Sequence, residues 1–476
     1  MKNVIMSLLK IYGNYWGGIS KGIWDFSKNL NNSTKMVRPE PSNNPWQEIS
    51  DFFDSFALGL QIAEEGAMGS VEAARAYHSK LVAEAMEAYM KALMSGSPTP
   101  IGDLVQAEAD ALETVVNAYP KAIKEIEPKY GFKLNGDGYK LMDEDDCFCC
   151  YQVLPNNGIT VRENGKPVLI LPPYVLGPNI LAFLPGQGRS FVHNFANKGI
   201  PTYIRIVKDI QTIVAVQEMK REDDCLGTKK FCETIAARHG KMVTLTGYCQ
   251  GGFMAALDVL SGELDHVVDA LITCVAPMDG TRSKTLCDFM DQIPVKNRGL
   301  EGATKILANG NRVIDGSQMS FLFKLKAMES RAPIPEFYQQ LATVGKAGIS
   351  EVAAAINYWL LYDKVDIPLE ITRLSHISYS KPVYKNGKLP VKMFGRNLNF
   401  KRINEMGIRW LICVAGKDDL VDGDAALAPL DYVDSSLIKV VRHPKGHASL
   451  ATDRYDYNFW SYVQFHMELD DEYQSF

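Results

Sequence analysis

The sequence predicts an α/β protein with a mostly parallel central sheet, an inserted cap or lid, and a helical N-terminal region. Compact apolar runs of strand length recur after about residue 145, and helical patterns lie between several of them. A glycine-flanked turn, "TGYCQGGF", joins one of these runs to a helical pattern. Apolar runs buried on both faces are what a parallel sheet covered by helices requires.

Residues 1–144 form the helical N-terminal region of this prediction. The stretch "EEGAMGSVEAARAYHSKLVAEAMEAYMKALM" is rich in Ala, Glu, Met and Leu at helical spacing, and "SGSPTP" ends it sharply. A second helical stretch follows that break. The first 26 residues space their apolar side chains around Lys2, Lys10 and Lys21, as an amphipathic helix does. Such a segment either docks on the domain or lies on a lipid or polymer surface.

The sheet is expected in two parts, residues 145–285 and 405–476, which the cap, residues 286–404, separates. The insertion contains two helical stretches, "FLFKLKAMES" and "AGISEVAAAINYWLLY". An insertion late in a parallel sheet forms a lid over the strand ends. The expected strands are "CFCCYQVLP", "PVLILPPYV", "IPTYIRIV", "MVTLTGYC", "ALITCVAPM", "RWLICVAGKDD" and "SLIKVVRH".

The turn "TGYCQGGF" has the form of a nucleophile elbow, with Cys249 where a serine is usual. Such a strand-to-helix turn lifts the nucleophile off the backbone at the carboxyl edge of the sheet. It also aims the following N–H, that of Gln250, at the place where an oxyanion develops. Gly247, Gly251 and Gly252 fit because a Cβ at these positions would clash in so tight a turn.

The partners of the cysteine are expected later in the chain, because the α/β-hydrolase fold orders its triad as nucleophile, acid and base. The carboxylate-rich loop "KDDLVDGDA" supplies the acid, with Asp419 as first choice, Asp418 next and Asp422 a more distant third. His447, in the loop after the last expected strand, is the first choice for the base, and His443 is the alternative.

The second oxyanion donor is expected in "PPYVLGP", the loop after "PVLIL", from the backbone N–H of Tyr174 or Val175.

A thiol in the elbow also affects which reaction is expected. An adjacent imidazole makes the thiolate available near neutrality. Acyl transfer from a thioester such as acyl-CoA to Cys249 is nearly isoenergetic, and the acyl group stays reactive enough to pass to an alcohol. This favours acyl transfer over hydrolysis, with a cysteine hydrolase as the alternative.

Composition sets further limits on function. The chain has 476 residues and a net charge of −5, and we find no basic patch that would bind nucleic acid. No apolar stretch is long enough to span a bilayer. Nine scattered cysteines favour free thiols in a reducing cytoplasm. Cys147, Cys149 and Cys150 alternate as small residues on a strand do, and without a second Cys/His pair we expect no metal site.

Several segments together resemble the polyhydroxyalkanoate synthases, which polymerise 3-hydroxyacyl-CoA into storage polyester. "LTGYCQGGF" resembles their G-x-C-x-G-G box, and "PVLILPPYVLGPNILAFLPGQGRSFVHNFANKGIPTYI" is similar to their strand and double-proline loop. "NYWLLYDKVDIPLEITRLSHISYSKPVYKNGKLP" is similar to their cap. "VAGKDDLVD" and "GHASL" match their acid and base loops, and "NNPWQEISDFF" resembles an N-terminal segment of the longer members.

The resemblance implies an acyltransferase of this type with Cys249, Asp419 and His447 as the catalytic residues. Cys249 would hold the growing acyl chain, and His447 would deprotonate the thiol and then the attacking 3-hydroxyl. The implied substrate is 3-hydroxyacyl-CoA and the product CoA, with no permanently bound cofactor. A cytoplasmic location, a polyester granule surface and a homodimer are also implied. The alternatives are a thioesterase or depolymerase on the same scaffold, and a catalytically silent granule protein.

Two positions depart from the pattern of that family. Tyr174 stands where the family usually has Trp after the two prolines, and Val207–Ile210 replaces a W-R-N-P segment.

Overall fold

The computed structural model describes residues 2–36, 44–175, 177–284, 287, 303–319, 332–454 and 463. The chain divides into two compact units, and each takes segments from distant parts of the sequence. One unit comprises residues 1–128, 293–303 and 318–362, and the other comprises residues 129–292, 304–317 and 363–476. The predicted insertion, residues 286–404, is therefore divided between the two units.

The second unit contains an eight-stranded sheet with the order β1-β2-β4-β3-β5-β6-β12-β13. Its first two strand pairings, β1 with β2 and β2 with β4, are antiparallel, and the others are parallel. The strands are β1 (Tyr139–Glu144), β2 (Phe148–Val153), β3 (Val168–Leu171), β4 (Thr202–Val207), β5 (Val243–Tyr248), β6 (Val268–Cys274), β12 (Arg409–Ala415) and β13 (Ile438–His443). All seven predicted strands are present. Every residue of β3 and β5 is buried, as a central parallel sheet requires.

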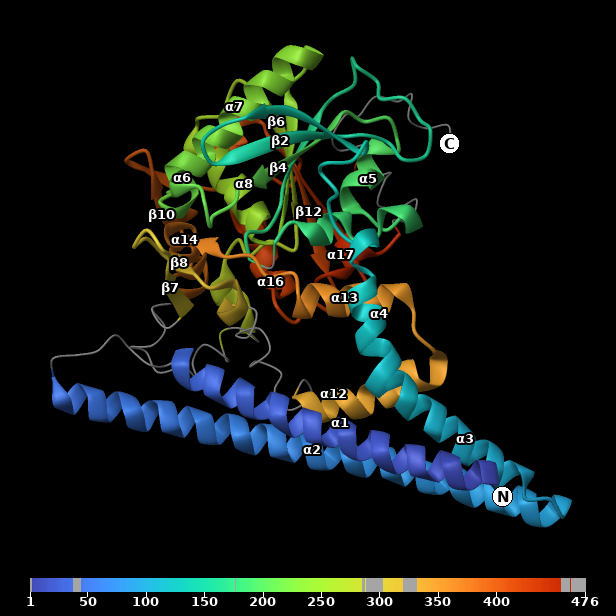
Figure 1. Ribbon diagram of the computed structural model, residues 1–476. Coiled ribbons are helices and arrows are strands. Elements are labelled where there is room, and N and C mark those ends of the chain that lie inside the picture. Colours follow the sequence, from blue (N-terminus) through green and yellow to red (C-terminus); the bar gives the residue numbers. More distant parts are fainter. Residues whose placement is uncertain are drawn as a thin grey trace. The chain divides into compact units, whose positions relative to one another are not determined.

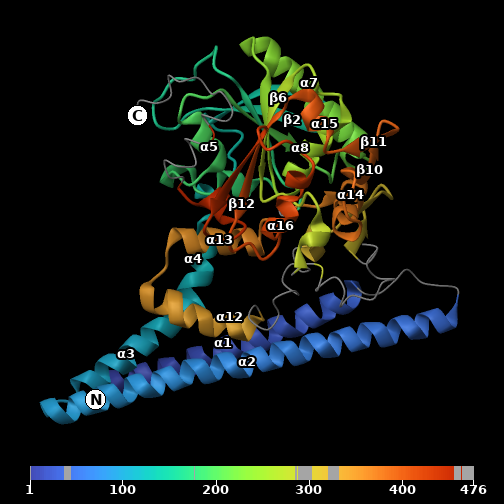
Figure 2. The ribbon, with the colours of Figure 1, turned by 180° about the vertical axis from the view of Figure 1, so that it is seen from behind.

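Helices cover both faces of this sheet (Figures 1 and 2). The long α7 and the post-elbow α8 lie together on one face, and α5 and α17 lie on the other. The bounds of the helices are α5 (Phe191–Ala196), α6 (Val214–Gln217), α7 (Arg221–His239), α8 (Gln250–Ser261), α14 (Leu369–Ser380), α15 (Arg402–Met406), α16 (Gly423–Ala426) and α17 (Ser449–Thr452). This arrangement is the α/β-hydrolase fold that the sequence predicts.

The insertion contributes small pieces to the sheet unit. A three-stranded sheet joins β7 (Thr304–Ile306), β8 (Arg312–Ile314) and β9 (Ile367–Pro368), and α14 packs on it. A hairpin joins β10 (Lys388–Met393) and β11 (Arg396–Asn399). The predicted helical stretch at residues 321–330 lies outside the described residues.

The other unit is helical, with α1 (Lys2–Met36), α2 (Pro45–Ser95), α3 (Thr99–Glu113), α4 (Tyr119–Glu125), α12 (Pro333–Gln340) and α13 (Glu351–Leu361). The break predicted at "SGSPTP" is present, because α2 ends at Ser95 and Gly96 takes the left-handed conformation at φ 63°. An apolar core that includes Tyr77, Leu112 and Leu341 holds α2, α3 and α12 together.

The helical unit ends earlier than residue 144. Residues 129–144 belong to the sheet unit, and β1 is an antiparallel edge strand that the sequence prediction missed. The segment "YKLMDE" has no fully buried position, so it carries no apolar run that would mark it as a strand.

Candidate active site

The elbow is built as its glycines predict. β5 ends at Tyr248, α8 begins at Gln250, and Cys249 between them has φ 51° and ψ −122°. A positive φ is rare for a residue with a side chain and typical of functional sites that the surrounding fold holds in a strained conformation. A Cβ at Gly247 would collide with the backbone of Gly251, and a Cβ at Gly251 with the carbonyls at the end of β3. The backbone N–H of Cys249 donates to the carbonyl of Cys274 at 2.8 Å, which fixes the turn to β6.

The histidine that meets the acid loop is His447. Its Nδ1 lies 2.7 Å from Oδ2 of Asp418, whose side chain is fully buried. His443, the alternative base, sits at the end of β13 with its Nε2 3.3 Å from Asp453. The structure therefore brings together His447 and the loop carboxylate, and holds His443 elsewhere.

The acid of this pair is Asp418, which corrects the first choice from the sequence, Asp419. Oδ1 of Asp418 accepts the backbone N–H groups of Leu420 and Val421, each at 2.9 Å. This turn folds the Asp418 carboxylate inward and leaves Asp419 exposed. The third choice, Asp422, takes the N-cap position of α16, and its backbone N–H donates to the hydroxyl of Ser283 at 3.2 Å.

The pKa of His447 depends on the neighbouring Cys249 and Asp418. Burial lowers the pKa of His447, but the Cys249 thiolate, the Asp418 carboxylate and hydrogen bonds to both raise it, to about 10. The imidazole thus lies beside both the Cys249 sulfur and the Asp418 carboxylate, and both favour its protonated form. An imidazolium beside a cysteine is the arrangement that makes a thiolate nucleophile available.

Tyr248 supports the loop that carries His447, a role that the sequence analysis did not predict. Its hydroxyl donates to the backbone carbonyl of His447 at 2.6 Å, and its ring meets the imidazole edge-on, with centroids 6.1 Å apart. Because Tyr248 directly precedes Cys249, one rigid strand end carries the nucleophile and holds the base loop. The only signal in the sequence is an aromatic residue next to the nucleophile.

The side chain of Gln250 changes the expectation for the oxyanion site. Its Oε1 accepts the backbone N–H of Val175 at 3.0 Å, so that N–H is occupied and Val175 is not an open oxyanion donor. Its Nε2 donates to the hydroxyl of Ser375 on α14 at 2.5 Å. The backbone N–H groups of Gln250 and Tyr174 stay as the predicted donors. Gln250 also joins the double-proline loop to a cap helix.

Tyr174 holds the same loop through a buried hydrogen-bond network. Its hydroxyl donates to Oδ1 of Asp224, which also accepts from Arg205 at 2.6 Å. Arg205 further donates to the hydroxyl of Thr228 at 2.6 Å, and Thr228 donates to Asp258 on α8 at 2.9 Å. Burial and the neighbouring Asp224 raise the pKa of Asp258 well above its usual value. The network therefore holds one buried ion pair, Arg205 with Asp224, next to Asp258, whose burial favours the neutral carboxyl.

The cap contributes Tyr379, one helical turn after Ser375 on α14. A Cβ at Gly280 would collide with the Tyr379 ring, so the glycine lets the ring lie against the loop that follows β6. Burial raises the pKa of Tyr379, and so do the negative charges of Cys249 and Asp418. The Tyr379 phenol is therefore close enough to Cys249 and Asp418 for their charges to affect it. The sequence prediction missed this placement.

A cavity of about 470 Å³ lies on another side of the double-proline loop. Its lining includes Pro172, Tyr174, Lys208, Lys305 and Asp366, and does not include Cys249. Lys208 pairs with Glu144, and Lys305 pairs with Asp366. The cavity is therefore adjacent to the loop and separate from Cys249.

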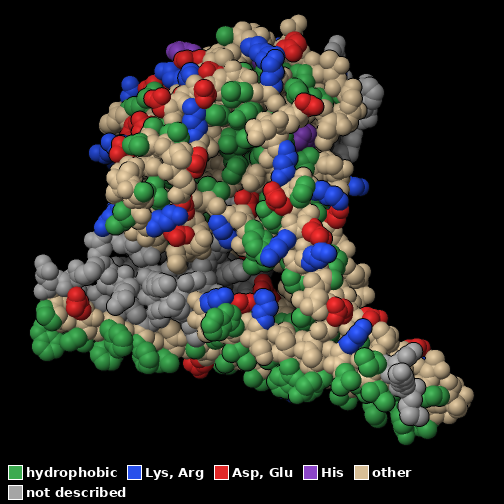
Figure 3. Space-filling model, in the orientation of Figure 1, with side chains coloured by type: hydrophobic (Ala, Val, Ile, Leu, Met, Phe, Trp, Pro, Cys, Tyr) green, Lys and Arg blue, Asp and Glu red, His purple; other side chains and the backbone are tan. Residues whose placement is uncertain are grey.

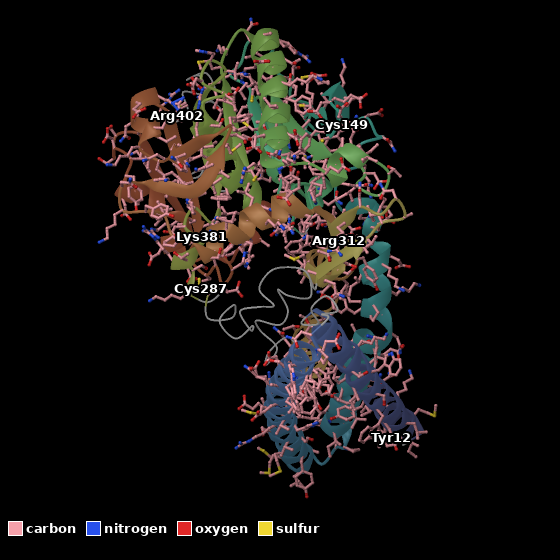
Figure 4. All side chains as sticks on the ribbon, turned by 90° about the vertical axis from the view of Figure 1, so that its left-hand side faces the viewer. Tyr12, Cys149, Cys287, Arg312, Lys381 and Arg402 are labelled. Carbon is pink, nitrogen blue, oxygen red and sulfur yellow. The ribbon has the colours of Figure 1, made fainter. Side chains whose placement is uncertain are left out.

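Within the described residues, no cluster of three His, Cys, Asp or Glu side chains could hold a metal ion. Cys147 and Cys150 are buried on or beside β2, and Cys149, labelled in Figure 4, is half-buried on the same strand. In the same part of the chain, no helix is both long and apolar enough to cross a membrane.

Comparison with known proteins gives fold-level likeness alone. No protein-family model matches the sequence, and no curated protein matches it. Among solved structures, the chain is similar to DcsB in complex with a substrate analogue, at 14% identity and TM-score 0.38, covering 70% of this chain and 99% of DcsB. It is similar to an α/β-hydrolase fold protein from Chitinophaga pinensis, at 11% identity and TM-score 0.37, covering 70% and 97%.

A third similar structure is the thioesterase domain from the curacin biosynthetic pathway, at 11% identity and TM-score 0.34, covering 66% of this chain and 94% of that domain. These scores are low, so the fold rests on the sheet order and on the elbow between β5 and α8. Both are those of the α/β-hydrolase fold.

Proposed function

We propose that the protein is an acyltransferase of the polyhydroxyalkanoate synthase type, which polymerises 3-hydroxyacyl-CoA and releases CoA. The observation that carries the proposal is the thiol at the elbow beside a histidine that Asp418 holds at 2.7 Å. A thiol nucleophile keeps the acyl group as a thioester, which an alcohol can attack. The segments that resemble the synthases supply the substrate class.

The charge state of His447 gives a balanced sequence of proton transfers. The Cys249 thiolate attacks the carbonyl of the acyl-CoA thioester, and the N–H of Gln250 stabilises the oxyanion. The CoA sulfur leaves with the proton of the His447 imidazolium. The neutral imidazole then takes the proton of the incoming 3-hydroxyl, whose oxygen attacks the Cys249 thioester. The ester forms, the thiolate leaves, and the imidazolium is restored.

Nothing in this cycle needs a permanently bound cofactor, and CoA enters only as part of the substrate and product. The acceptor distinguishes this function from that of a cysteine hydrolase, because water in place of the 3-hydroxyl gives free acid. Tyr379 is the side chain that we assign to the acceptor side, since it lies near the reactive pair and comes from the cap.

The proposal includes a cytoplasmic location at the surface of a polyester granule. α1 carries large exposed apolar side chains together with Lys10, Lys21 and Lys28, which suits a segment lying on an apolar surface. These side chains include Tyr12, labelled in Figure 4, and Trp16 and Trp24, which are 69%, 52% and 63% exposed. Replacement of the two Trp residues by Ser should reduce cosedimentation with polyester granules and leave the turnover of soluble substrate unchanged.

The experiment that tests the reaction combines purified protein with 3-hydroxybutyryl-CoA and separates CoA, insoluble polymer and free 3-hydroxybutyrate. Polymer with stoichiometric CoA supports the synthase, whereas free acid in its place assigns a thioesterase. Cys249→Ala should abolish CoA release, and Cys249→Ser should leave it severely weakened. Cys149→Ala, which removes a half-buried thiol outside the site, is the matched control. Unchanged CoA release from Cys249→Ala would refute the assignment of Cys249, whereas a wild type that releases no CoA would favour a catalytically silent role.

A further inference from the structure

The segment that follows β6, residues 275–283, begins with a strained residue; we call it the β6 loop. Val275 has φ 46° and is 1% exposed. A positive φ is rare for a β-branched residue and costs free energy, so it persists where the surrounding structure enforces it, often at a functional site. Val275 also lies beside the nucleophile, because the preceding residue, Cys274, pairs with Tyr248 and accepts the backbone N–H of Cys249 at 2.8 Å. Two residues with a positive φ therefore follow the ends of neighbouring strands.

Asp279 connects the β6 loop to the cap. Figure 3 shows acidic and basic side chains spread over the visible face of the sheet unit, whereas Asp279 is only 3% exposed. Its Oδ2 accepts the backbone N–H of Val383, which follows α14, and Nε of Arg282, each at 3.2 Å. Its backbone N–H donates to the carbonyl of Ala425 on α16 at 3.0 Å. These bonds satisfy a buried carboxylate and hold the β6 loop between the cap and α16.

Ser283, at the end of the β6 loop, contacts the turn that carries the acid. Its side chain is fully buried, and its hydroxyl donates to the carbonyl of Leu420 at 3.1 Å and accepts the backbone N–H of Asp422 at 3.2 Å. The hydroxyl therefore uses its single proton and a lone pair on the same turn. Asp418 holds the other side of the turn, because its Oδ1 accepts the N–H groups of Leu420 and Val421.

The position of this turn decides which carboxylate meets His447. Asp418 and Asp419 are adjacent in the chain, and the turn places Oδ2 of Asp418 2.7 Å from Nδ1 of His447. Without the hydroxyl of Ser283, the carbonyl of Leu420 and the next N–H along the turn would lose their protein partner. The turn would then be held by Asp418 alone, so the carboxylate that orients the imidazole would be less well fixed.

From these contacts we propose that Ser283 is a positioning residue, which acts on His447 through Asp418. The strained start of the β6 loop and the hydrogen bonds of Asp279 set the place of its hydroxyl. The inference rests on the proposed function only where it concerns CoA release. Alkylation of Cys249 tests it without any acyl donor.

The first test measures the rate at which iodoacetamide alkylates Cys249 in the full chain, with the modified peptide identified by mass spectrometry. Ser283→Ala should slow alkylation about 5-fold, the factor that corresponds to one hydrogen bond. Ser283→Thr retains the hydroxyl and should stay within about twofold of wild type. The matched control is Ser261→Ala, which removes a 2% exposed hydroxyl that bonds within α8 and should leave the rate unchanged.

A double-mutant cycle then separates positioning from a general loss of stability. If Ser283 acts through Asp418, Ser283→Ala should add little to the slowing that Asp418→Asn causes, whereas independent effects multiply. By NMR, the ring of His447 should titrate at a lower pH in Ser283→Ala than in wild type, because the carboxylate that raises its pKa is held less well. Ser261→Ala should leave that titration unchanged.

Thermal melting identifies a variant that does not fold. If Ser283→Ala does not fold, Ser283→Cys replaces it, because a thiol keeps the shape and is only a weak donor. Unchanged alkylation and an unchanged His447 titration in the folded variant would overturn the proposal. So would slowing that multiplies with that of Asp418→Asn, or a Ser283→Thr as slow as Ser283→Ala. A wild type that releases no CoA would refute the proposed reaction alone, since alkylation would still decide the role of Ser283.

Discussion

The pairing of His447 with Asp418 gives a sharp prediction, because two adjacent carboxylates compete for one role. In Asp418→Asn the amide oxygen can still accept the backbone N–H groups of Leu420 and Val421. The amide NH₂ then faces Nδ1 of His447, where Oδ2 stood at 2.7 Å. Two donors would oppose each other, so the ring must turn or change its tautomer.

The size of the effect follows from the bond that is lost. A hydrogen bond to a charged group contributes about 1.5–3 kcal/mol, which corresponds to roughly 10- to 150-fold in rate. In enzymes with an Asp–His pair the wrong tautomer lowers kcat by up to about 10⁴-fold. We therefore expect Asp418→Asn to slow the acylation of Cys249 by at least about 10-fold. Asp419→Asn, at an exposed neighbour, should remain within about twofold of wild type.

The assay must separate chemistry from folding. Alkylation of Cys249 by iodoacetamide, followed by mass spectrometry, reports thiolate availability without any assumption about the natural acyl donor. CoA release from 3-hydroxybutyryl-CoA reports the full reaction. Melting temperatures of the two Asn variants identify a variant that fails to fold. The reasoning is refuted if Asp419→Asn loses as much alkylation rate as Asp418→Asn, or if neither variant loses any.

Three further predictions concern the surroundings of the site. Tyr174→Phe removes the hydrogen-bond donor to buried Asp224 and should lower the rate of Cys249 acylation about 10-fold, with little change in the rate of alkylation. Tyr174→Trp retains a donor and should restore much of the acylation rate. The control is Tyr203→Phe, which changes a buried tyrosine that is hydrogen-bonded to His239. Tyr248→Phe should raise the mobility of the base loop and lower both rates, and unchanged rates would contradict its role. By NMR, the ring of His447 should titrate near pH 10, and at lower pH in Cys249→Ala. Since this folded-state pKa exceeds the unfolded value of about 6.5, protonation stabilises the fold fully below that pH and the contribution is lost as pH rises through 10.

Local patterns in the sequence were sufficient to predict the elbow at Cys249 and the buried strands around it. The glycines of the elbow collide with nearby backbone if a Cβ is added, so their spacing had a direct steric cause and located Cys249. The buried strands could also be predicted, because β3 is apolar at every position and β5 carries Val, Leu and Tyr with only threonines and a glycine between them. The edge strand β1 could not, since an exposed edge needs no apolar run.

The acid could not be chosen from sequence because Asp418 and Asp419 are chemically alike and differ only in the direction that the turn gives them. That direction depends on two backbone hydrogen bonds within the loop. The occupied N–H of Val175 depends on a side chain 75 residues away, and the hydroxyl of Tyr174 on one 50 residues away. Contacts between distant segments have no local pattern, so Gln250 and Tyr379 could not be given their structural roles in advance.

The buried network also gives a physical reason for the departure at Tyr174. In the proposed reaction, the loop after β3 and the strained turn at Cys249 must both be held in place, since both would face one developing oxyanion. An apolar residue at position 174 would pack, but would leave the fully buried Asp224 with Arg205 as its charged partner and one fewer donor. Tyrosine supplies that donor and ties the loop to β4, α7 and, through Thr228 and Asp258, to the helix that begins at the elbow. Hydrogen bonds thereby connect both the loop and the helix that follows Cys249 to the same buried network. The proposed reaction requires such a connection, because its oxyanion geometry must be fixed.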